Sequence, residues 1–175
     1  MNAAELIRSL GLTPHPEGGW YRELHRSAVQ VTAPQGRRSA LTTIYYLLEH
    51  GQQSRWHVVA SDEAWHFYAG EPLALLDYDP ASGRLLKHVL GSPGEQLLKG
   101  VSLGAAAAWA ATAHAAPVAV IPAGHWQAAW PLGGHALVGC SVGPGFEFGD
   151  FRFVADVADH QRHFSQAMSG FTGLL

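Results

Sequence analysis

The stretch GQQSRWHVVASDEAWHFYAG, residues 51–70, has the spacing G-x5-H-x-V-x3-E-x6-G. This spacing places His57 and Val59 on one face of a strand, and Glu63 follows on the next strand after a short turn. Two adjacent strands of this kind bring the three side chains to one point inside a small β-barrel. The glycines at both ends suit positions where the chain must turn. The stretch therefore predicts a barrel with His57 and Glu63 directed to its interior.

A second pattern lies about fifty residues further along the chain, in VIPAGHWQAAW, residues 120–130. Pro122, Gly124 and Gln127 follow one another with the spacing P-x-G-x2-Q. We expect His57, Glu63 and Gln127 to converge inside the barrel.

Both patterns resemble the two signatures of the cupin superfamily, G-x5-H-x-H-x3-4-E-x6-G and G-x5-P-x-G-x2-H-x3-N. At the four metal-ligand positions of these signatures, Val59 and Gln127 stand in place of two histidines. The first glycine and the final asparagine of the second signature are replaced by Ala116 and Pro131.

The wider sequence is similar to a family of small single-domain cupins described as domain of unknown function 985. The similarity covers most of residues 5–155 and rests on PHPEGGWYRE (14–23), IYYLL (44–48), SDEAWHFYAGEPL (61–73), VIPAGHWQAAW (120–130) and LVGCSVGPGFEFGDF (137–151). The resemblance implies a double-stranded β-helix, a homodimer and an internal pocket for a small polar ligand. It also extends to sugar-nucleotide epimerases of the same fold. The alanine-rich run 104–116 is longer than the usual connection there, and we interpret it as an insertion with high helix propensity.

The composition fits one soluble domain, residues 1–175, with its core at about 15–155. Of the 175 residues, 47% are apolar and only 14% are charged, below the usual ~25%, so part of the surface is expected in a dimer interface. The net charge of −3 and the lack of a basic run argue against nucleic acid and membrane as partners. We see no signal peptide and no apolar run of ~18 residues. The single cysteine, Cys140, is expected to be a buried thiol, and a cytoplasmic location fits.

Local patterns predict an all-β jelly-roll with short terminal helices. Asn2 and Glu5 form a capping box for a first helix, and Gly11 ends it. Strands are predicted from period-two alternation. They cover residues 20–26, 41–48, 56–59, 64–68, 73–78, 84–89, 118–121, 125–130, 136–142 and 152–154, and a final helix is predicted over 155–168.

His57 and Glu63 are the candidate catalytic residues. A neutral imidazole and a carboxylate in an apolar barrel can perform general acid–base chemistry or bind a metal. The alternative is a buried structural pair. We expect no cofactor, because Val59 offers no ligand atom and Gln127 offers only a neutral oxygen. If a divalent transition metal is bound, its ligands are predicted to be His57, Glu63 and Gln127 with water.

Five further residues are candidates for ligand binding: Gln127, His66, Tyr45, Trp65 and Arg22. Aromatic walls with a few polar groups suit a sugar or heteroaromatic ligand, although ordinary core packing also explains such aromatic residues. Strand alternation places His66 on the face opposite Glu63, where a dimer contact is the alternative role. Arg22 lies in PHPEGGWYRE, a loop that can cap the barrel mouth or exchange between subunits. Its side chain suits an anionic ligand or, equally, Glu23 or Asp150 nearby in a dimer.

Three functions remain open from the sequence. The first is a metal-independent isomerase or epimerase acting on a small polar, sugar-like substrate, with Glu63 or His57 moving the proton. The second is a metal-dependent oxygenase or lyase, and the third is a non-catalytic small-molecule binding protein. The fold alone does not choose among them.

Overall fold

The structure is a computed structural model, and it describes residues 1–93 and 114–156. Strands make up most of the described chain. In chain order the elements are α1 (Ala3–Leu10), β1 (Thr13–Pro14), β2 (Trp20–Arg26), β3 (Gln30–Ala33), β4 (Gly36–Ser39), β5 (Thr42–Glu49), β6 (Ser54–Val59), β7 (Asp62–Gly70), β8 (Leu73–Asp79), β9 (Arg84–Leu90), β10 (Val118–Ile121), β11 (Trp126–Pro131), β12 (His135–Gly143), β13 (Phe151–Phe153) and two 3-10 turns, η2 (Phe148–Asp150) and η3 (Val154–Asp156). No helix within the described residues is long and apolar enough to cross a membrane.

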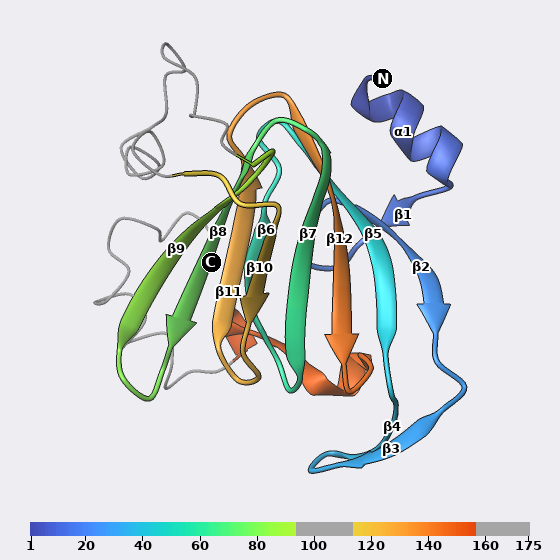
Figure 1. The fold of residues 1–175 in the computed structure, drawn as a ribbon, viewed down its shortest axis with the longest axis vertical. Coiled ribbons are helices and arrows are strands. Elements are labelled where there is room, and N and C mark those ends of the chain that lie inside the picture. Colours follow the sequence, from blue (N-terminus) through green and yellow to red (C-terminus); the bar gives the residue numbers. More distant parts are fainter. Residues whose placement is uncertain (94–113, 157–175) are drawn as a thin grey trace.

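Two antiparallel sheets face each other and form the barrel (Figure 1). The larger sheet has the order β1-β2-β5-β12-β7-β10, and the smaller has the order β13-β6-β11-β8-β9. Several neighbours in each sheet are far apart in the sequence, as in β5 beside β12 and β6 beside β11. This is the all-β jelly-roll that the sequence predicts. A third, two-stranded sheet, β3-β4, projects beyond one end of the barrel (Figure 1).

The main core lies between the two sheets. Alternate residues of each strand face inward, and they shield one another from water at about 25 cal/mol for each Å² of apolar surface. The cluster consists of Tyr46, Leu48, Trp65, Leu73, Leu75, Leu90, Ile121, Ala129, Ala136, Val138 and Cys140. Cys140 is a buried free thiol, as expected.

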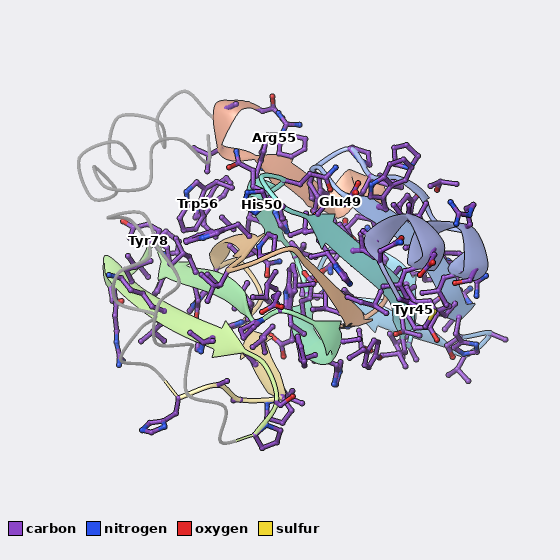
Figure 2. The ribbon with its side chains drawn as sticks, turned by 90° about the horizontal axis from the view of Figure 1, so that it is seen from above. Tyr45, Glu49, His50, Arg55, Trp56 and Tyr78 are labelled. Atoms are coloured by element: carbon purple, nitrogen blue, oxygen red, sulfur yellow. The ribbon has the colours of Figure 1, made fainter. Side chains whose placement is uncertain are left out.

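The outer faces of the two sheets carry separate apolar clusters. Helix α1 begins at Asn2 with the predicted capping box and ends at Gly11 in the left-handed conformation. It covers Leu47 and Leu137 on the outer face of the larger sheet. On the smaller sheet, an outer cluster includes Trp56 and Tyr78. Figure 2 shows these two side chains on one side of the molecule and Tyr45 on the other.

The strands predicted from alternation are present with shifts of one or two residues at their ends. The sequence analysis missed β1 and the β3-β4 hairpin, whose residues show no apolar alternation and whose turn depends on Gly36 at φ 109°. Most of the predicted final helix, from residue 157 onward, and the alanine-rich run up to residue 113 lie outside the described residues.

Candidate functional site

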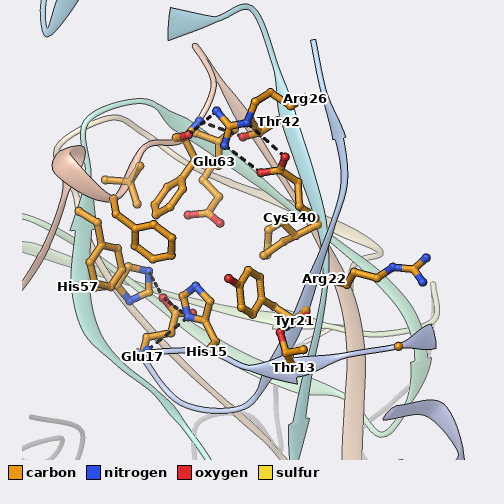
Figure 3. A pocket seen from close by; sticks show the side chains of 18 residues that line it. Thr13, His15, Glu17, Tyr21, Arg22, Arg26, Thr42, His57, Glu63 and Cys140 are labelled. Carbon is orange, nitrogen blue, oxygen red and sulfur yellow. Dashed lines mark hydrogen bonds and ion pairs between the residues drawn. The ribbon is translucent and has the colours of Figure 1, made fainter. Parts of the chain in front are cut away.

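A cavity of about 220 Å³ lies inside the barrel, close to the larger sheet (Figure 3). Strands β2, β5, β6, β7 and β12 supply its walls, and the loop before β2 and the segment after β12 complete them. His57 from β6 and Glu63 from β7 both line it, as the spacing in residues 51–70 predicts. Val59 lines the same cavity, which confirms that it shares the inward face with His57.

His57 is held in one tautomer by the backbone. Its Nδ1 lies 2.7 Å from the carbonyl oxygen of Arg55, and a carbonyl only accepts, so Nδ1 carries the hydrogen. Nε2 then has a free lone pair, and it lies 3.4 Å from Oε2 of Glu17. His57 is only 1% exposed, so this contact is shielded from water.

Glu17 reaches the site from the loop that precedes β2. It is 6% exposed, and its Oε1 accepts a hydrogen bond of 3.0 Å from the Ser54 hydroxyl. The ring of His15 lies beside it, with Nδ1 3.7 Å from Oε2. The loop is bound to the barrel through the Arg55 N–H, which donates to the Glu17 carbonyl at 3.1 Å.

Two glycines allow this loop to enter the barrel. Gly18 has φ 116°, and a Cβ there would lie 2.1 Å from the carbonyl oxygen of Gln53. Gly19 has φ 69° and approaches the carbonyl oxygen of Leu47 almost as closely. Only glycine combines such backbone angles with so little space. The sequence EGG therefore fixes the position of Glu17.

Glu63 is supported from behind by a chain of two hydrogen bonds. Gln127 donates its Nε2 amide to Oε2 of Glu63 at 2.5 Å. Trp65 in turn donates its indole N–H to Oε1 of Gln127 at 2.9 Å. All three side chains are buried, so this chain fixes the orientation of the Glu63 carboxylate, which Figure 3 shows directed into the cavity.

Burial favours the neutral form of all four ionisable groups in the cavity, which are Glu17, Glu63, His57 and His15. It raises the pKa of Glu17, with His15 and the Ser54 hydroxyl opposing, and raises the pKa of Glu63, with His57 opposing. It lowers the pKa of His57 and that of His15. All four groups are therefore biased toward their neutral forms, and the contact between Glu17 and His57 is best described as a carboxylic acid facing an imidazole.

Aromatic rings form one wall of the cavity. Phe151 stacks on the His57 ring with centroids 5.1 Å apart, and Phe146 lies 6.1 Å from Phe151. Phe148 stacks on His15 at 6.1 Å. On another side, Tyr21 contacts His15 edge-on at 4.5 Å, and Figure 3 shows its hydroxyl directed into the cavity.

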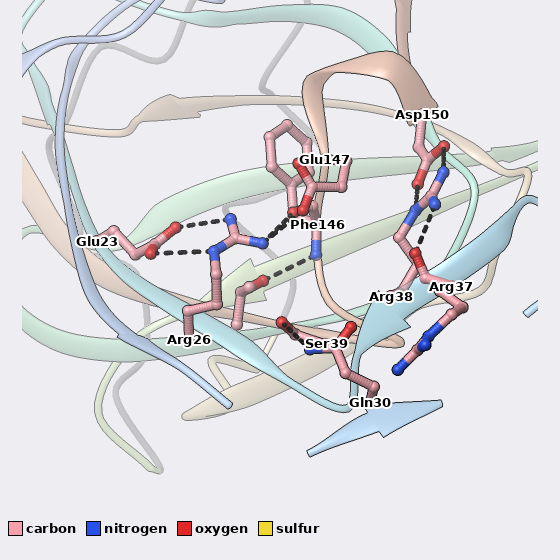
Figure 4. Close-up of polar contacts among 10 residues, drawn as sticks. Glu23, Arg26, Gln30, Arg37, Arg38, Ser39, Phe146, Glu147 and Asp150 are labelled. Carbon is pink, nitrogen blue, oxygen red and sulfur yellow. Dashed lines mark hydrogen bonds and ion pairs between the residues drawn. The ribbon is translucent and has the colours of Figure 1, made fainter. Parts of the chain in front are cut away.

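Two arginines fix the segment 146–150, which contributes Phe146 and Phe148 to the cavity wall (Figure 4). Arg26 binds Glu23 at 2.9 Å and Glu147 at 2.7 Å. Arg38 makes a two-pronged contact with Asp150, with both N···O distances at 2.6 Å. These pairs hold residues 146–150 against the cavity.

The four positions that bind metal in the cupin signatures do not fit a transition metal in this chain. Val59 presents only hydrocarbon to the cavity. The Gln127 oxygen is bonded to Trp65, and its amide N–H faces Glu63, so Gln127 offers no ligand atom. Within residues 1–93 and 114–156, no three His, Cys, Asp or Glu side chains are arranged to hold a metal ion.

The structure places the predicted ligand-binding residues in different layers of the barrel wall. Gln127 and Trp65 lie one layer behind the cavity wall and act on Glu63. Tyr45 and His66 lie on the outer face of the larger sheet, because alternation directs Tyr46 and Trp65 inward. Tyr45 contacts Tyr68 and the guanidinium of Arg22 there and does not line the cavity.

Arg22 borders the cavity, but its side chain turns away from it (Figure 3). Within the part of the chain that the structure describes, it makes no contact with Glu23 or Asp150. Its guanidinium carbon lies 5.9 Å from the centroid of the Tyr45 ring, as a cation–π contact. Sequence reasoning located the loop PHPEGGWYRE at the barrel mouth but did not select Glu17. The signal was present in the two glycines that follow it.

The chain is similar to two proteins of known structure along nearly their whole length. One is a hypothetical protein from Leishmania major, 29% identical over 95% of this chain and 98% of that chain, with a TM-score of 0.71. The other is a protein from Shewanella oneidensis, 32% identical over 95% of both chains, with a TM-score of 0.73. No curated protein matches the chain.

A more distant likeness supports the fold alone. Oxalate decarboxylase from Bacillus subtilis is 16% identical over 89% of this chain and 34% of its own, with a TM-score of 0.55. The family model described as cupin superfamily (DUF985) matches residues 4–154. Together with the two facing sheets and the inward His57 and Glu63, this match shows that the chain belongs to the DUF985 family of the cupin superfamily.

Proposed function

We propose that this protein is a metal-independent isomerase or epimerase that acts on a small polar, sugar-sized substrate inside the barrel. One observation supports this most: the Glu63 carboxylate and the His57 imidazole line one shielded cavity, each held by a defined hydrogen bond. Proton transfer at neutral pH is served best by a group whose pKa lies near 7. Burial raises the pKa of Glu63 in that direction, and it lowers the pKa of His57, which keeps the imidazole neutral and able to accept a proton.

Glu63 suits the role of base. In its ionised form it removes a proton from a carbon next to a carbonyl group, and the electron pair moves into the carbonyl to give an enolate. A proton returned from the carboxylic acid of Glu17 to the opposite face of the same carbon completes an epimerisation. For a hydroxy-carbonyl substrate, loss of the hydroxyl proton and return of a proton to the former carbonyl carbon complete an isomerisation. His57, 3.4 Å from Glu17, can take and return the proton that Glu17 holds. General acid–base help of this kind contributes ~10²–10⁴ in rate.

The test is a search for turnover. Sugar nucleotides and small hydroxy-carbonyl compounds are incubated with the protein in D₂O, and NMR follows deuterium entering at carbon. We expect exchange on at least one compound, and we expect metal chelators to leave it unchanged. Tight binding of one compound without any exchange would contradict catalysis and favour a small-molecule binding protein.

We also propose a cytoplasmic homodimer, joined through the sheet surface near the N-terminal segment. Few residues are charged, and Leu24, Val29 and Leu41 are exposed on or beside β2 and β5, near the N-terminal segment. A single buried thiol suits a reducing compartment. Light scattering at micromolar concentration measures the assembly, and a monomer would reject the dimer.

A further inference from the structure

We propose that the ligand carries a positive charge, in the form of a small amine or quaternary ammonium compound seated between Glu17, Glu63 and the wall of Phe146, Phe148 and Phe151. The inference rests on the proposed function only in taking the cavity as the ligand site. It narrows the ligand class from small and polar to small and cationic.

The charges around the cavity favour a cation. Glu17 and Glu63 are the buried acids among its lining residues, and no lysine of residues 1–93 and 114–156 lines it. Arg22 turns its side chain away, and Arg26 at the mouth is bound to both Glu23 and Glu147. The interior can therefore carry negative charge with no internal cation to balance it.

The histidines do not supply the missing charge. His15 stacks on Phe148 and His57 stacks on Phe151, and burial lowers the pKa of both histidines. Ionising Glu63 in this setting is costly, because the groups around it are the Gln127 amide, neutral His57, Glu17 and the Cys140 thiol. A cationic ligand offsets that cost directly, whereas a neutral polyol does not.

The aromatic wall adds a second, independent preference. Phe146, Phe148 and Phe151 all line the cavity, and they contact one another at centroid distances of 5.1 Å and 6.1 Å. The faces of aromatic rings carry negative electrostatic potential and attract ammonium groups within about 6 Å, with the largest effect in sites shielded from water. A methylated or primary amine fits between this wall and the two carboxylates.

The experiment compares two probes of the same shape. Choline carries a quaternary nitrogen, and 3,3-dimethyl-1-butanol is its neutral carbon analogue. Binding to ¹⁵N-labelled full-length protein is followed by NMR titration at pH 8, with erythritol as a neutral polyol probe. We expect choline to bind about tenfold or more tightly than the neutral analogue.

Matched variants locate the effect. Glu63→Gln and Glu17→Gln each remove one buried carboxyl group that a cation can hold in its ionised form, with little change of shape, and each should remove most of the preference for choline. Glu147→Gln removes the same charge from the exposed rim and should keep that preference. Circular dichroism and thermal unfolding check that each variant is folded.

The outcomes separate the two proposals. Equal binding of choline and its neutral analogue, or binding of erythritol alone, would overturn the cationic ligand but leave the cavity as a ligand site. Binding of none of the three probes would count against both. A preference for choline that survives in Glu63→Gln and Glu17→Gln would also overturn the inference.

Discussion

Two carboxylate–imidazole contacts in this barrel differ in the direction of the carboxyl pKa. In the cavity, Glu17 faces His57, and burial raises the pKa of the carboxyl. On β8, Asp77 is 3% exposed, and His125 Nδ1 lies 2.7 Å from its Oδ1. Burial raises the pKa of Asp77 as well, but its interactions with His88 and His125 outweigh burial, so the net pKa is lowered.

The difference follows from the histidines. The side chain of His125 is 23% exposed and that of His88 is 31% exposed, so a charged imidazole there keeps contact with water. The side chain of His57 is 2% exposed, and a charge on it would be cut off from water. His88 Nε2, 3.9 Å from Asp77, is too distant for a hydrogen bond, so His125 makes the closer contact. The same two residue types thus favour an ionised carboxylate at Asp77 and a neutral carboxylic acid at Glu17.

The largest expected difference between the two regions is in catalytic rate. Glu63→Gln should lower turnover of any substrate found by ~10²–10⁴, because it keeps the shape of the side chain but removes the basic oxygen. Asp77→Asn, the equivalent change in the second region, should leave the rate of the folded enzyme nearly unchanged. Steady-state kinetics on both variants measures this contrast, and a fully active Glu63→Gln would remove Glu63 from the mechanism.

The second largest expected effect is on metal binding inside the cavity. Purified protein should carry clearly less than one tightly bound transition metal per chain. Val59→His adds an imidazole beside His57 on the inward face, and we expect at least about tenfold tighter Zn²⁺ binding, since even outer-shell changes alter metal affinity 10–100-fold.

The matched control for this metal test is Val58→His. Val58 packs on the outer cluster of the smaller sheet, so this variant should bind Zn²⁺ no better than the wild type. Elemental analysis after dialysis against chelator, with Zn²⁺ titration, measures both effects. A full equivalent of metal on the wild type would contradict the prediction.

Asp77→Asn should destabilise the fold by about 1–3 kcal/mol at pH 7, because it leaves His125 without its charged partner. The pKa of Asp77 is lowered in the folded state, so its ionised form stabilises the fold above pH ~4. That contribution is lost as the pH falls through the folded pKa. Urea unfolding should therefore show a smaller difference from wild type at pH 3 than at pH 7, and an equal difference at both would reject a stabilising role of ionised Asp77.

The smallest expected effect is on the stability of Glu17→Gln, and its pH dependence runs opposite to that of Asp77→Asn. The pKa of Glu17 is raised in the folded state, so its contribution is most favourable below pH ~4.5 and is lost as the pH rises through the folded pKa. Glu17→Gln removes the ionisation and should stabilise the protein at pH 8 by about 0.5–2 kcal/mol relative to its effect at pH 4.5. Thermal unfolding at the two pH values measures this, with Ser54→Ala as a control for loss of the loop contact.

Sequence reasoning predicted the part of the site that depends on strand period. His57, Val59 and Glu63 face inward because their spacing places them on the inner faces of two consecutive strands, β6 and β7, which lie in facing sheets. The same rule excludes His66 and Tyr45 from the cavity. It could not distinguish Gln127 in a second layer from Gln127 at the surface of the cavity, because that depends on how far each side chain reaches.

Glu17 was missed for a different physical reason. Its position depends on the positive φ angles of Gly18 and Gly19 and on hydrogen bonds to Ser54 and Arg55, which lie more than thirty residues away. No periodic pattern encodes such a loop. The lowered pKa of Asp77 could not be predicted from the sequence either, because it depends on the positions of His88 and His125 in the fold.

The close approach of Gly18 to Gln53 also has a consequence for how this chain tolerates sequence change. Loops are ordinarily the most variable parts of a domain. Here any side chain at position 18 would collide with a backbone carbonyl and push Glu17 out of the barrel. In a complete substitution library, position 18 should therefore be as intolerant as a buried tryptophan, whereas Gly51 and Gly83, which have open space around them, should accept alanine at the cost of backbone strain alone.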